Sequence, residues 1–212
     1  MMMKRTAFKS LMIAGSLSAA MMTLGACGQL IQPSEPTTFF RLVQNPAMTR
    51  EIVAPRLMNS DIQIGVGPVQ IPGYADRPQI VTAGPGGQLV VDDLHHWAEP
   101  LPDNIERILV SDMGAMLNTS RVYPFPTSFH PDQDSLQIAV EIRDIIREEN
   151  GNVRLVASWN VKRLLDNRLL TRGNASYNSQ ESADTYGDYA SKISQMLRQL
   201  SKDILRSVDE KI

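Results

Sequence analysis

Between residues 136 and 178 the sequence has three successive strand-like stretches, and the first two alternate apolar and polar side chains. The stretches cover 136–143, 153–162 and 168–178. Asn150-Gly151 and Asp166-Asn167 separate them, and both dipeptides are typical of tight turns. A period of two places alternate side chains on one face of a strand. The pattern therefore predicts an antiparallel meander of three strands with one buried face.

Shorter signals of the same kind precede the meander. A β-branched and aromatic stretch at 37–42 and an alternating stretch at 61–66 each predict a strand. The runs 79–82 and 88–92, joined by a glycine-rich link, predict a hairpin, and 122–123 predict a short strand. Residues 44–60 contain Pro46 and Pro55 and are expected to be irregular. We expect the strands at 61–66 and 122 to be parallel, joined by a crossover.

Two apolar stripes with helical spacing predict the main helices. The first covers 103–117, with Asp103 as N-cap and Glu106 as its capping-box partner. The second, from Tyr186 to Ile204, is expected to cover the sheet and close the core. Together the elements predict a single α/β sandwich domain, whose mixed and mostly antiparallel sheet is covered by two main helices.

The only cysteine, Cys27, follows a basic start and a short apolar run that ends Leu24-Gly25-Ala26. The run resembles a secretory signal and is too short to span a bilayer comfortably. Its end resembles the lipobox of bacterial lipoproteins, which implies cleavage before Cys27 and acylation of that residue. An uncleaved apolar anchor with an incidental cysteine is the alternative. The expected organisation is a signal peptide at 1–26, a lipidated tether at 27–36 and the folded domain at 37–212.

The lipobox resemblance also implies a location. Several acyl chains on one residue make membrane attachment effectively permanent. By the sorting rule of such lipoproteins, Gly28 in place of an aspartate after the cysteine implies the outer membrane, with the domain facing the periplasm. The whole chain has a net charge of −2. Loss of the three basic residues in 1–26 leaves a net charge of −5, which argues against nucleic acid as a partner.

Residue types that carry catalysis or bind metals are present without a recognisable motif. The sequence lacks a nucleophile elbow, a zinc-protease motif and a phosphate-binding loop. His95 and His96 are adjacent, so on an extended segment they point in opposite directions and make a poor chelating pair. We expect neither a catalytic nor a metal site, and no cofactor other than the covalent lipid on Cys27.

Two segments combine residue types that dominate protein interfaces. The stretch 71–81 contains Tyr74, Asp76 and Arg77, and the stretch 95–101 contains Trp97 and Glu99. These five residues are the candidate partner-binding set. The alternative is that they pack against the domain and fix loop geometry.

The same segments, IPGYADRPQIV and HHWAEPL after IGVGPV, resemble the PqiC/YmbA-type lipoproteins of the ABC-type transport auxiliary lipoprotein family. TTFFRL near the domain start and the terminal helix extend the resemblance over most of the chain. It implies a non-catalytic outer-membrane lipoprotein that works beside an MCE-domain periplasmic protein in intermembrane lipid transport. A homo-oligomer is also expected. An envelope-integrity lipoprotein that transports nothing and a periplasmic hydrolase with an unrecognised site are the alternatives.

Overall fold

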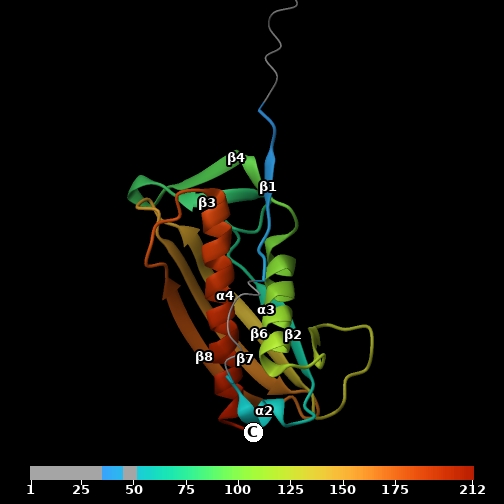
Figure 1. The fold of residues 1–212 in the computed structure, drawn as a ribbon. Helices are drawn as coiled ribbons and strands as arrows, with labels where there is room; N and C mark the ends of the chain where they lie inside the picture. Colours follow the sequence, from blue (N-terminus) through green and yellow to red (C-terminus); the bar gives the residue numbers. More distant parts are fainter. Residues whose placement is uncertain (1–34, 45–51) are drawn as a thin grey trace, which may run out of the picture. The chain divides into compact units, whose positions relative to one another are not determined.

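The computed structural model describes residues 35–44 and 52–212. The predicted lipidation site, Cys27, lies outside these residues. One compact unit runs from Thr37 to Ile212. Within it the described strands form two sheets, and three helices accompany them (Figure 1). The predicted α/β class is confirmed, with the strands divided between the two sheets.

The larger sheet has five strands in the order β5-β2-β6-β7-β8. The strands are β2 (Ile64–Gln70), β5 (Val122–Pro124), β6 (Leu136–Arg147), β7 (Val153–Arg163) and β8 (Leu169–Asn178). The pairs β6–β7 and β7–β8 are antiparallel, which confirms the predicted meander. Strand β2 pairs in parallel with both β5 and β6, as the crossover prediction requires for β2 and β5. Gly151 adopts a φ of +83° in the β6–β7 turn, a conformation that favours glycine.

The smaller sheet has three strands in the order β1-β4-β3. Strands β3 (Gln79–Ala83) and β4 (Leu89–Trp97) form the predicted antiparallel hairpin. Strand β1 (Thr38–Phe40) pairs in parallel with the end of β4, where Phe40 lies opposite Trp97. Strand β4 is longer than the sequence pattern indicates, because it continues through His95 and His96 to Trp97.

Helix α3 (Leu101–Leu117) begins two residues before the predicted start. Its N-cap is Pro100, and no side chain caps it, so the prediction that Asp103 is the N-cap is wrong. Pro102 explains the difference, because proline is tolerated in the first helical turn, where its missing N–H has no partner to lose. Asp103 lies in that turn instead, where its negative charge interacts favourably with the positive end of the helix dipole.

Helix α4 (Tyr186–Asp209) begins with a capping box formed by Thr185 and Asp188. Each side chain accepts a hydrogen bond from the other residue's backbone N–H, at 3.1 Å for Thr185 Oγ1 and 3.0 Å for Asp188 Oδ2. Helices α3 and α4 pack against each other over the larger sheet (Figure 1), with α3 on β2 and α4 on β7 and β8. The two helical stripes and the buried face of the meander form one apolar core, as predicted.

Helix α2 (Pro55–Met58) lies in the stretch expected to be irregular, and that expectation is wrong there. Asp209 explains this short helix, because its Oδ1 accepts hydrogen bonds from the backbone N–H groups of Arg56 at 2.8 Å and Leu57 at 2.9 Å. A residue more than 150 positions away thus satisfies the free donors of the first turn.

Among the residues that the structure describes, those of the buried core lie between Leu42 and Val208. This described core belongs to the compact unit that starts at Thr37. Among the helices of the described residues, none is long and apolar enough to cross a membrane.

Candidate functional site

The first predicted contact segment is fastened to the larger sheet by Tyr74. Its hydroxyl donates a hydrogen bond to Asp144 Oδ1 at 2.6 Å and accepts one from the backbone N–H of Ile145 at 3.0 Å. Burial raises the pKa of Tyr74 well above its ordinary value, and the hydrogen bond to Asp144 raises it further. Tyr74 is therefore a neutral side chain that holds the 71–78 loop on strand β6.

Asp76 and Arg77 lie in the same loop with exposed side chains. The backbone N–H of Arg77 donates to the carbonyl of Ala75 at 2.9 Å, which closes a turn. Neither the Asp76 nor the Arg77 side chain forms a hydrogen bond or ion pair with another residue in the described part of the chain. These two charged groups are free to contact a partner.

Trp97 and Glu99, from the second predicted segment, make contacts within the domain. Trp97 ends strand β4, is only 6% exposed and packs on Tyr189 of α4 with ring centroids 6.1 Å apart. Glu99 forms an ion pair with Arg107 on helix α3. The backbone N–H of Trp97 donates to Pro78 O at 2.7 Å, so the structure brings the two predicted segments side by side. It places Trp97 in the core, however, while Arg77 faces solvent.

A polar and aromatic cluster lies where β4 meets the start of α4. His95 Nδ1 lies 2.8 Å from Asp92 Oδ1, and Tyr186 donates to Asp92 Oδ2 at 2.8 Å. The His95 and Tyr186 rings are 4.5 Å apart. Burial raises the pKa of Tyr186 to about 12, with the hydrogen bond to Asp92 contributing. For Asp92, burial acts to raise the pKa, but the hydrogen bonds from His95 and Tyr186 outweigh it and lower the pKa overall.

This cluster borders an open cavity of about 480 Å³, called here the α4 N-terminal cavity, which is lined by Phe40, His95, Arg147, Asp184, Thr185, Tyr186 and Gly187. His95 packs near Phe40 while His96 packs near Phe39, consistent with the two histidines pointing in opposite directions. Within residues 35–44 and 52–212, no hydroxyl or thiol nucleophile is hydrogen-bonded to His95. Nor do these residues contain a group of three or more potential metal ligands.

A second cavity, of about 470 Å³, lies at the other end of α4 and is called here the α4 C-terminal cavity. Its lining residues come from four separate segments: Ile62, Asp134, Leu136, Arg163, Arg168, Leu170, Lys211 and Ile212. Helix α4 has 24 residues, so the two cavities are separated by roughly 36 Å of helix. The sequence did not point to either cavity. The only local signal is the run KRLLDNRLLTR at 162–172, which the sequence pattern predicts to be two strands joined by a turn.

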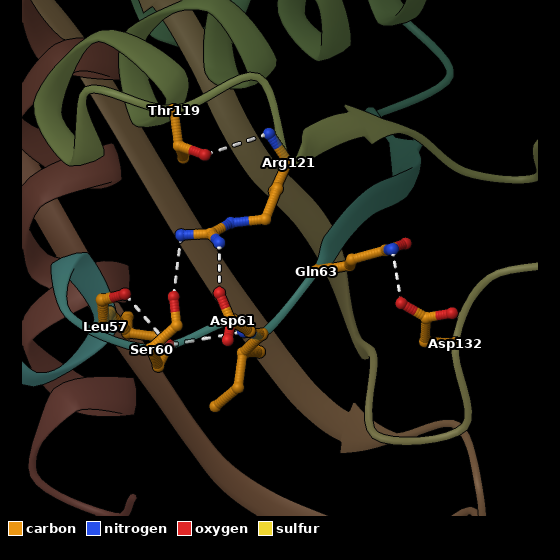
Figure 2. A network of polar contacts seen from close by, with 8 residues as sticks. Leu57, Ser60, Asp61, Gln63, Thr119, Arg121 and Asp132 are labelled. Carbon is orange, nitrogen blue, oxygen red and sulfur yellow. Dashed lines mark hydrogen bonds and ion pairs between the residues drawn. The ribbon is translucent and has the colours of Figure 1, made fainter.

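A polar network beside the α4 C-terminal cavity fixes the segment that contains Ile62 (Figure 2). The guanidinium of Arg121 donates to Asp61 Oδ1 and to the carbonyl of Ser60, both at 2.7 Å. Gln63 Nε2 donates to Asp132 Oδ2 at 2.6 Å and so ties the start of β2 to the loop before β6. Ile62 therefore lies between two cross-linked residues.

Comparisons with known proteins give the same fold and a family. A crystal structure described as an uncharacterized protein has a TM-score of 0.65 and 18% identity, over 82% of this chain and 99% of that one. Protein XCC0632 from Xanthomonas campestris has a TM-score of 0.60 and 16% identity, over 82% and 96% of the two chains. At these identities the likeness shows the fold alone.

No curated protein matches the sequence. The model of the family described as "ABC-type transport auxiliary lipoprotein component" matches residues 44–205, which is most of the chain. The resemblance to PqiC/YmbA-type lipoproteins is thereby confirmed, and the chain belongs to the family of ABC-type transport auxiliary lipoprotein components.

Proposed function

We propose that this protein is a non-catalytic accessory component of an MCE-type intermembrane lipid transport system. In this proposal, acylated Cys27 anchors it in the outer membrane and the domain faces the periplasm. The family match over residues 44–205 carries the proposal, because it identifies an auxiliary lipoprotein of a transporter. The lipobox around Cys27 supports the anchor, and Gly28 supports outer-membrane sorting.

The geometry of the domain supports a binding role. Asp92, His95 and Tyr186 are arranged like a hydrogen-bonded relay, but His95 contacts no nucleophile among the described residues. In a Ser-His-Asp site the histidine must lie within hydrogen-bonding distance of the attacking hydroxyl. The aromatic packing of His95 and Tyr186 instead joins the small sheet to α4.

The partner is proposed to be an MCE-domain periplasmic protein, and the exposed pair Asp76 and Arg77 is the proposed contact. Both side chains are free, and Tyr74 fixes the loop that presents them. A preorganised charged loop loses little conformational entropy on binding. Self-association into a homo-oligomer would place several such loops around one transport tunnel.

The decisive experiment is affinity purification of the lipidated protein from envelope membranes in mild detergent, followed by mass spectrometry. An MCE-domain protein should co-purify, and Arg77→Ala should reduce its recovery. Arg172→Ala is the matched control, since Arg172 is also exposed and without a partner among the described residues. Phospholipid exchange between inner and outer membranes should slow when the protein is depleted. Recovery of no MCE-domain protein, together with unchanged lipid exchange, would reject the proposed function.

A further inference from the structure

The α4 C-terminal cavity is formed where one end of the larger sheet meets the end of the chain. Leu136 at the start of β6 lies opposite Arg163 at the end of β7 in the strand register. The β7–β8 turn supplies Arg168, strand β8 supplies Leu170, and Lys211 and Ile212 follow helix α4. Its volume of about 470 Å³ falls within the range of roughly 300–1,000 Å³ that is usual for small-molecule sites.

The charged lining of this cavity is mainly positive. The lining has three basic side chains, those of Arg163, Arg168 and Lys211, against the acidic side chain of Asp134 and the main-chain carboxylate of Ile212. Arg163 is partly neutralised, because its guanidinium donates to Asp166 Oδ2 at 2.7 Å. The side chains of Arg168 and Lys211 form no hydrogen bond or ion pair with any other residue that the structure describes. Two cations without an ion-pair partner among the described residues thus lie at one cavity of a domain that carries a net negative charge.

The other half of the lining is apolar. Leu136 is buried, and Ile62 and Leu170 are half-buried with their side chains packed against the core. Ile212 completes this wall. A site with cations on one side and aliphatic side chains on the other has the chemistry of an amphiphile with a negative head, since an inorganic anion would gain nothing from the aliphatic wall.

One residue of the apolar wall, Ile62, is held in place by polar contacts of its neighbours before any ligand arrives. Figure 2 shows Arg121 reaching across to Ser60 and Asp61, and Gln63 reaching to Asp132. These bonds fix the residues on both sides of Ile62. In a preformed site, the ordering of side chains reduces the affinity for the ligand less.

We propose that the α4 C-terminal cavity binds an anionic phospholipid, with the phosphate on Arg168 and Lys211 and the first part of an acyl chain against Ile62 and Leu170. This inference rests on the proposed function and specifies the class of lipid that the protein contacts. The site lies at the C-terminal end of α4. Strand β1 lies at the other end of this helix, where Phe40 packs near Tyr186, the first helical residue.

The test uses the chain without residues 1–26 and with Cys27→Ser, which retains every core residue that the structure describes. Isothermal titration calorimetry compares three probes: dihexanoyl phosphatidylglycerol below its micelle concentration, dihexanoyl phosphatidylcholine, and glycerol 3-phosphate. The anionic lipid should bind about tenfold more tightly than the zwitterionic lipid, because both carry the phosphate but the cationic choline group of phosphatidylcholine is repelled by Arg168 and Lys211. Glycerol 3-phosphate should give no measurable binding.

Paired variants locate the site. Arg168→Gln should weaken phosphatidylglycerol binding about tenfold, whereas Arg172→Gln, on strand β8 and outside the cavity lining, should leave it unchanged. Leu170→Asn should also weaken binding, whereas Leu169→Asn should not, because Leu169 is exposed and does not line the cavity. Thermal unfolding of each variant checks that the fold is kept. If Leu170→Asn unfolds, the exposed substitution Arg168→Gln still tests the site.

Three results would overturn the proposal. Equal affinity for the two lipids would remove the charge argument. Glycerol 3-phosphate binding as tightly as the lipid would leave only a phosphate site. Unchanged binding in Arg168→Gln would place the lipid elsewhere. Co-purification with an MCE-domain protein but no phosphatidylglycerol binding would reject this inference alone. Phosphatidylglycerol binding without co-purification of an MCE-domain protein would reject the proposed function alone.

Discussion

Replacement of Trp97 by alanine should destabilise the domain strongly. The indole is 6% exposed, belongs to the main core and packs on Tyr189. Truncating a buried tryptophan leaves a cavity and costs about 3–5 kcal/mol. In a domain of this size each kcal/mol lowers Tm by roughly 2–4 °C, so Trp97→Ala should lower Tm by about 6–20 °C. Trp97→Phe keeps an aromatic ring in the site and should lose clearly less.

The assay is thermal unfolding followed by far-ultraviolet circular dichroism, with the chain that lacks residues 1–26 and carries Cys27→Ser. Arg77→Ala is the internal comparison, because that side chain is exposed and unpaired in the described part of the chain. It should change the unfolding free energy by no more than about 0.5 kcal/mol. If Trp97→Ala unfolds within about 2 °C of the parent, by the same scaling, the assignment of Trp97 to the core is wrong. Its role as a partner contact would then regain support.

Three further predictions follow from local geometry and from the sequence. Gly173→Ala should lower the unfolding free energy by about 1–3 kcal/mol, because a Cβ at Gly173 would lie 2.7 Å from Trp159 Cε2; chemical denaturation measures this, and an unchanged midpoint contradicts it. Thr185→Ala should cost about 1 kcal/mol through loss of the capping box with Asp188, measured in the same denaturation, and a stability equal to the parent would show that the cap is dispensable. Gly28→Asp should move the lipoprotein towards the inner membrane in density-gradient fractionation, whereas an unchanged distribution would argue against the sorting rule here.

Much of the fold could be predicted because its signals are local. The alternation at 136–178 and the Asn150-Gly151 turn lie within a few residues of the contacts they specify. The capping box of α4 was not predicted, although its Thr185 and Asp188 are only three residues apart. The helix start at Leu101 was misplaced because Asp103 offered a good cap in sequence, while Pro102 allowed an earlier beginning.

The candidate site was less predictable, because exposure is not a local property. The sequence supports an interface role equally well for four residues: Tyr74, Asp76, Arg77 and Trp97. Only the packing of β4 against α4 places Trp97 in the core. Only the hydrogen bond from Tyr74 to Asp144 shows that Tyr74 holds the loop on the sheet. Asp76 and Arg77 remain in solvent because nothing in the described domain packs over their turn.

The sequence by itself determined the order and type of most elements, the meander, and the lipobox that predicts an anchor at Cys27. Each of these depends on side-chain periodicity or on a short motif that neighbouring residues complete. The tertiary structure decided the division into two sheets, the capping of α2 by Asp209 and the α4 C-terminal cavity. Those features join residues such as Ile62, Leu136, Arg168 and Lys211, which are far apart in the chain. No local pattern encodes such a meeting, because the core brings these segments together only when the whole domain has folded.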